Sequence, residues 1–139
     1  MLNKSDVISE LKNQLESKLK LLNKNLNSAI ISRNSDTKSS AGDKFETSRE
    51  MAQIEIHKLE IEIVKIQQFI SDLLSKNSKL ITTDKGVFFI AIPFGKLVVN
   101  NTEVFCISNS APIAQHLVNA EKLEVIEFSK LKYSILGIS

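Results

Sequence analysis

Apolar residues recur at steps of three or four along two long segments in the first half of the chain. The first stripe consists of Ile8, Leu11, Leu15, Leu19, Leu22, Leu26 and Ala29, and the second of Ala52, Ile56, Leu59, Ile63, Ile66, Ile70 and Leu73. This spacing keeps one face of a helix apolar, as the seam of a coiled coil requires. Gly42 is the only Gly or Pro before residue 78. The pattern therefore predicts two long helices.

The helical pattern fails between residues 34 and 43, where the chain reads NSDTKSSAGD. Ser, Asn, Asp and Gly favour turns over helix interiors. A short connection between helices of similar length makes them antiparallel neighbours. We predict a coiled-coil hairpin over residues 1–76 with its tip at about 34–43. Arms of roughly 30 residues would be about 45 Å long, so we expect a projecting rod.

Beyond residue 77 the period of the apolar pattern shortens towards two. Strands are predicted near residues 80–82, 86–92, 95–99, 103–107, 124–128 and 132–138, with a tight turn at Asn100-Asn101. Ser110-Ala111-Pro112 is typical of a helix start, with Ser110 as the cap. We therefore predict an α+β protein whose second domain, residues 77–139, is an antiparallel sheet with one short helix.

Composition narrows the class of protein. Hydrophobic residues make up 42% and charged residues 24%, which is typical of a globular protein. The net charge of +2 gives no strong field for nucleic acid or membrane. Cys106 is the only cysteine, which indicates a reducing compartment. The chain start lacks a signal-peptide pattern, and the longest apolar run, residues 87–94, is too short to span a bilayer. We expect a cytoplasmic protein.

No residue constellation indicates an enzyme that acts alone. His57 and His116 have no second ligand at metal-binding spacing, and each is interpreted as structural or solvated. Cys106 lies in a predicted strand between Phe105 and Ile107, so a core position fits better than a nucleophile. We expect no cofactor of the protein's own and no small-molecule substrate.

The tip carries three acids, Asp36, Asp43 and Glu46. Asp43 and Glu46 have the spacing of a capping box, in which each side chain bonds to a backbone N–H of the other residue. Carboxylates at the end of a long rod are also the ligands that Mg²⁺ prefers. Both interpretations stay open from the residues alone.

The end of the chain reads "ISNSAPIAQHLVNAEKLEVIEF" followed by "LKYSILGIS", so that a strand leads into a Ser-Pro helix and two strands end in a Tyr-x-Ile pattern. This segment resembles the end of the Gre family of bacterial transcription elongation factors. Ser110, Pro112 and Ile113 match the helix, and Tyr133 and Ile135 match the last strand. An N-terminal coiled coil followed by a small FKBP-like domain matches the family over the whole chain.

The resemblance implies a mechanism in which the catalytic centre belongs to RNA polymerase. The C-terminal domain would dock beside the secondary channel, and the hairpin tip would reach the active site through it. Tip acids would then help to hold a Mg²⁺ ion, so that the polymerase hydrolyses the 3′ end of backtracked RNA. The implied partner is bacterial RNA polymerase, with the nascent RNA 3′ end contacted indirectly and no membrane involved.

Carrying the family's residues onto this chain nominates Asp43 and Glu46, because residues 42–46 reproduce its Gly-Asp-x-x-Glu. Asp36 is the reserve candidate. A register shifted by three residues would instead place Lys38 and Ala41 on the acidic positions. Two alternatives therefore accompany transcript cleavage: a non-cleaving regulator in the same channel, and a coiled-coil scaffold or adaptor unrelated to polymerase.

Overall fold

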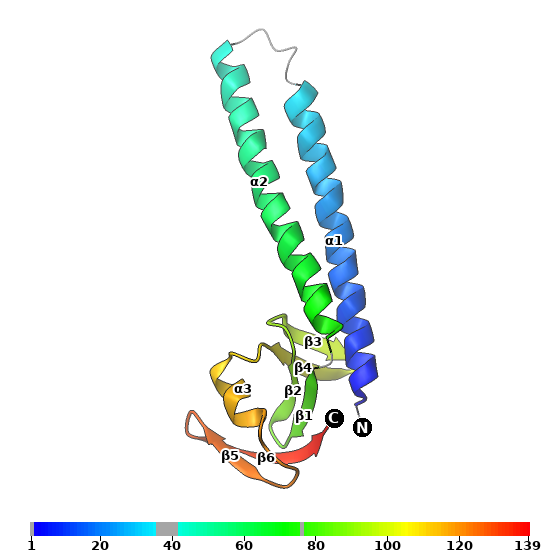
Figure 1. Cartoon of the computed structure of the whole chain (residues 1–139). Helices are drawn as coiled ribbons and strands as arrows, with labels where there is room; N and C mark the ends of the chain where they lie inside the picture. The colour runs from blue at the N-terminus through cyan, green and yellow to red at the C-terminus, as the bar shows by residue number, and fades with distance from the viewer. Residues whose placement is uncertain (1, 36–41, 76) are drawn as a thin grey trace. The chain divides into compact units, whose positions relative to one another are not determined.

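Two long helices open the fold, as the apolar pattern predicts. A computed structural model describes residues 2–35, 42–75 and 77–139, apart from the side chains of residues 35 and 42–45. Helix α1 spans Lys4–Ser35 and helix α2 spans Gly42–Leu73, each with 32 residues. The two helices run in opposite directions (Figure 1). The two predicted helices are confirmed, while most of the tip predicted at about 34–43 lies outside the described residues.

The predicted seam is the buried side of both helices. On α2, five members of the stripe are 8% exposed or less, namely Ile56, Leu59, Ile63, Ile66 and Leu73. Leu15 and Leu22 are their buried counterparts on α1, while Leu19 and Leu26 are only half-buried. Two helices alone form a narrow core, which leaves part of the stripe in contact with water.

The second half of the chain forms one six-stranded sheet and one short helix, which confirms the α+β class. The strands are β1 (Lys79–Thr83), β2 (Gly86–Ile90), β3 (Gly95–Val99), β4 (Thr102–Ile107), β5 (Val125–Phe128) and β6 (Leu131–Ile138), and the helix is α3 (Pro112–Leu117). Their order across the sheet is β3-β4-β2-β1-β6-β5.

One strand pair departs from the predicted antiparallel sheet. Strands β2 and β4 are parallel, with Phe88 opposite Phe105 and Phe89 opposite Cys106. The reason is topological: β3 and β4 form a local hairpin, and β4 rather than β3 then returns beside β2. The sheet is therefore mostly, not wholly, antiparallel.

The tight turn predicted at Asn100-Asn101 is confirmed. Both residues have positive φ, 50° and 63°, as a two-residue hairpin turn with left-handed backbone requires. The β5–β6 turn uses Ser129 and Lys130 in the same way, at φ 52° and 67°, although neither residue type signals such a turn.

The sheet carries a core on each face. On one face, α3 places Ala114 and Leu117 against sheet residues that include Ile81, Phe88 and Ile135 (Figure 1). Their neighbours along the strands, such as Leu80 and Phe89, point to the opposite face and are at most 2% exposed. The central strands are therefore buried on both sides.

The chain divides into two compact units, residues 1–13 with 71–139, and residues 14–70. Residues 1–13 and 71–76, which the sequence places in the hairpin domain, thus belong to the sheet unit. Val7, Leu11 and Leu73 are buried within that unit, and Asn100 Nδ2 donates to Asp6 Oδ2 at 3.3 Å. The ends of the helices nearest the sheet contribute to its second core.

The predicted cap of α3 is wrong. The cap position is held by Ala111, and no side chain caps the helix. Ser110 lies one residue too early, and its Oγ lies 2.8 Å from Ser108 Oγ. Pro112 occupies the first turn as predicted, where its missing N–H costs little.

In the part of the chain that the structure describes, no helix has the length and apolar content needed to cross a membrane.

Replacing Phe89 by Ala should destabilise the sheet unit by about 3–5 kcal/mol, because the side chain is 0% exposed and its loss leaves a cavity. Urea denaturation followed by circular dichroism measures the change. The matched control is Val98→Ala on β3, where the side chain is 54% exposed and the loss should stay below about 1 kcal/mol. Equal losses in the two variants would contradict the assigned core.

Candidate functional site

The hairpin tip lies between Ser35, where α1 ends, and Gly42, where α2 begins. A polar contact links the two helices just below it: Arg33 Nη1 donates to Gln53 Oε1 at 2.9 Å. Arg33 Nε also donates to Asn34 Oδ1 at 3.4 Å. The bond to Gln53 joins the last turn of α1 to the fourth turn of α2.

The structure describes the three nominated acids to different extents. Asp36 lies outside them. Asp43 belongs to the first turn of α2 by its backbone, while its side chain lies outside the description. Glu46 is exposed on α2, three positions further along. Residues at this spacing share one side of a helix, and a helix N-terminus favours negative charge.

The start of α2 differs from the predicted capping box. That motif places Asp43 just before the first helical residue. Helix α2 instead begins at Gly42, so Asp43 is already its second residue. The dipole of the helix can still act on both carboxylates from this position.

The other reactive residue types are held apart. His57 is exposed on α2, and the His116 ring on α3 lies tilted against the Phe128 ring with 5.5 Å between ring centres. Among the described residues, no three His, Cys, Asp or Glu side chains are grouped so as to hold a metal ion. The described chain therefore offers no complete metal site of its own.

Cys106 lies in the core rather than on a reactive surface. Its side chain is 1% exposed, and desolvation raises the pKa of the thiol to about 12. A thiolate is the nucleophilic form, so this cysteine is inert in the folded protein.

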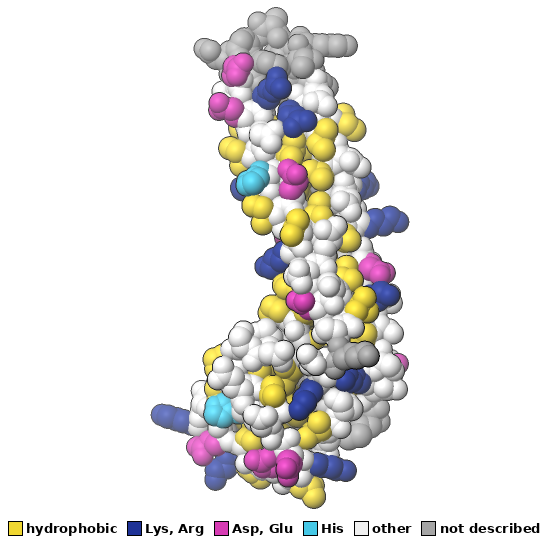
Figure 2. Space-filling model, viewed as in Figure 1, with side chains coloured by type: hydrophobic (Ala, Val, Ile, Leu, Met, Phe, Trp, Pro, Cys, Tyr) yellow, Lys and Arg dark blue, Asp and Glu magenta, His cyan; other side chains and the backbone are white. Residues whose placement is uncertain are grey.

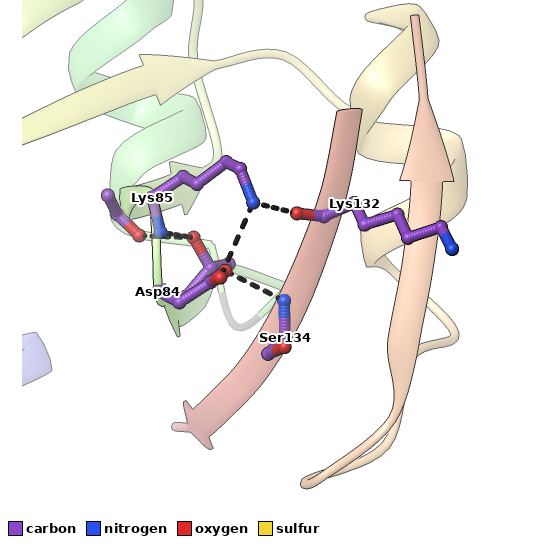
Figure 3. A network of polar contacts seen from close by, with 6 residues as sticks. Asp84, Lys85, Lys132 and Ser134 are labelled. Carbon is purple, nitrogen blue, oxygen red and sulfur yellow. Dashed lines mark hydrogen bonds and ion pairs between the residues drawn. The ribbon is translucent and has the colours of Figure 1, made fainter. Parts of the chain in front are cut away.

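A polar network at the β1–β2 turn was not singled out by the sequence (Figure 3). Asp84 Oδ1 accepts from Ser134 N at 2.8 Å, and Asp84 Oδ2 lies 3.4 Å from Lys85 Nζ. Lys85 Nζ also donates to Lys132 O and lies 5.5 Å from the centre of the Tyr133 ring. All five residues lie on the turn or on β6, so the network ties the β1–β2 turn to β6.

This network changes the acidity of Asp84. The hydrogen bond from Ser134 N–H lowers the pKa of the carboxyl below its ordinary 3.8, against a smaller opposing effect of desolvation. The Lys85 ammonium lowers it further. The role of Asp84 is structural, and the Asp-Lys-Gly turn after a strand was the signal that could have found it.

Asp84→Asn should weaken the dependence of stability on pH. As pH falls, the unfolded carboxyl protonates first, near 3.8, so the stabilisation by folded Asp84 is complete above that value. It is then lost as pH falls through the lower pKa of the folded protein. Urea denaturation at a series of pH values measures the difference between wild type and variant. Lys85→Met should retain most of the effect, because Ser134 makes the largest contribution.

Cys106 should react with thiol reagents only after unfolding. In native buffer, labelling with a chromogenic disulfide should be far slower than for a free thiol, and in urea it should reach the ordinary rate. Rapid labelling of the folded protein would contradict the buried position.

Comparison with family models, with curated proteins and with solved structures finds no match to this chain. The geometry of the described residues and the motifs of the sequence therefore carry the functional argument.

Proposed function

We propose that this protein is a Gre-like transcription factor that binds bacterial RNA polymerase, inserts its helical hairpin into the secondary channel and stimulates cleavage of backtracked RNA. It would not be an enzyme by itself, since the hydrolysis would be the polymerase's own activity. The cytoplasm of a bacterium is the setting that this proposal implies.

The observation that carries the proposal is the hairpin itself. Two antiparallel helices of 32 residues are each about 48 Å long, which suits a probe that enters a narrow channel. Asp36 lies in the connection between them, and Asp43 and Glu46 lie near the start of α2. A six-stranded α+β unit follows, in the place that the FKBP-like domain has in the Gre family.

The chemistry assigns separate tasks to the two partners. Asp43 and Glu46, with Asp36 in reserve, would each offer a carboxylate to a Mg²⁺ ion in the polymerase active site. Two carboxylates are fewer ligands than Mg²⁺ needs, so the polymerase and the RNA would supply the rest. When bound there, the ion would supply Lewis-acid chemistry for the scissile phosphate and the attacking water. Glu46 is exposed on α2 and is therefore accessible to such an ion.

A coiled-coil adaptor is the second candidate, and one observation favours it. Met51, Ile54, Ile61 and Val64 are each more than half exposed on α2. Contacts with polymerase at the tip and the sheet unit alone would not explain these exposed apolar side chains.

The test is an RNA cleavage assay on stalled, backtracked complexes of the cognate polymerase. The wild-type protein should accelerate release of short RNA, and Asp43→Ala with Glu46→Ala should reduce that acceleration by about 10²-fold while binding is retained. The matched control is Glu55→Ala, which removes an exposed acid of the same helix far from the tip.

The outcomes separate the candidates. Polymerase binding without any released RNA would leave the non-cleaving regulator, as would release that the double variant does not change. Failure to bind polymerase at all would reject both transcription roles and favour the adaptor.

A further inference from the structure

Helix α2 has a second apolar stripe that its pairing with α1 does not bury. Met51, Ile54, Ile61 and Val64 are 66, 56, 57 and 63% exposed. At 100° per residue, this stripe is centred on the side of α2 opposite the seam. Hydrophobic side chains are gathered on the visible face of the hairpin (Figure 2). A contiguous row of this kind marks an interaction surface.

The spacing within the outer stripe is that of a coiled coil. Ile54, Ile61 and Val64 of the outer stripe, with His57 between the first two, follow one another at steps of three, four and three, and Met51 lies beside this row. These are successive a and d positions of a heptad, with Ile54 and Ile61 at a. β-branched residues at a favour two strands when Leu fills d, whereas here His57 and Val64 fill d. The spacing thus indicates a helical partner, and the charges decide its identity and direction.

The surface of α2 already has the hole that such a partner needs. Glu50, Gln53, Ile54, His57 and Lys58 line an open, largely apolar hollow. In a parallel pair, a residue at position a enters a hole formed by one a, one g and two d residues of the facing helix. Around Ile54 these are Gln53 at g, and Glu50 and His57 at d. The hollow therefore fits Ile54 of a second copy.

The charged residues beside the outer stripe favour pairing with a second copy of the chain, with the two α2 helices parallel. In a parallel pair, a g residue faces the e residue five positions further along the partner. Glu60 at g would then face Lys65 at e of the other copy. Because the two copies are identical, the same pair forms a second time with the copies exchanged. In an antiparallel pair, e residues face one another, which would bring Lys58 of one copy to Lys65 of the other. Like charges oppose that arrangement.

We propose that two copies of this protein associate in parallel through the outer stripe of α2, centred on Ile54 and Ile61. The association is weak and depends on concentration, because three apolar positions and His57 form its core. It does not rest on the proposed role at polymerase, and a failed cleavage assay leaves it intact.

Sedimentation velocity of the full chain over a range of concentrations tests the association. Wild type should shift from monomer to dimer as concentration rises, and Ile61→Glu should remain a monomer. Leu21→Glu is the matched control, since Leu21 on α1 is 56% exposed but lies outside the stripe; its dimer should persist. A wild-type chain that is monomeric throughout would overturn the proposal and leave the stripe to a different protein.

A charge exchange tests the pairing itself. Glu60→Lys should weaken the dimer about tenfold, because both Glu60–Lys65 pairs become repulsive. The double variant Glu60→Lys, Lys65→Glu should restore the wild-type dissociation constant. A double variant that is as weak as the single one would overturn the assigned register.

Cross-linking tests the direction. Val64→Cys lies at a d position away from the centre of the stripe, so it meets its own copy only when the helices are parallel. Oxidation should give a disulfide-linked dimer, and buried Cys106 should not compete. A dimer by sedimentation that does not cross-link at this position would overturn the parallel arrangement.

Discussion

The constraint on which this fold depends is the burial of β1 and β2 on both faces. Leu80 and Ile81 are adjacent, point to opposite faces, and are 2% and 0% exposed. A sheet with two apolar faces needs two covers. Helix α3 is one cover, and the burial of Val7, Leu11 and Leu73 in the same unit shows that the ends of the long helices belong to the other. The same helices thus serve the sheet core at one end and the hairpin seam along the rest of their length.

Much of this architecture follows from patterns that the sequence displays openly. The seam of α2 was predictable because Ile56, Leu59, Ile63 and Ile66 recur at steps of three or four over about three turns. Residues at this spacing share one face of the helix, which is buried when it is apolar. The strands were predictable because Gly and Asn interrupt short β-branched runs. Asn100-Asn101 defines its turn locally, since Asn tolerates left-handed backbone at little cost.

The remaining features depend on contacts between distant residues. The local sequences of β2 and β4 do not determine that the two strands pair in parallel, because strand order depends on the whole sheet. Ser129-Lys130 turns left-handed because β5 and β6 pair on either side of it. Ser110 has the residue type of a cap, but the helix begins too late to use it. At the tip, the sequence can nominate Asp43 and Glu46, whereas the proposed role would also depend on ligands from another molecule.

The strand order also bears on how the chain folds during synthesis. The β1–β2, β3–β4 and β5–β6 pairs join neighbouring segments, whereas β1–β6 joins residues more than fifty positions apart. Closing so long a loop is entropically costly and slow. Until β6 emerges from the ribosome, the α3 face lacks Tyr133 and Ile135, two of its core residues. The two long helices emerge first and can pair early, so the nascent chain carries a formed hairpin while its sheet is still open.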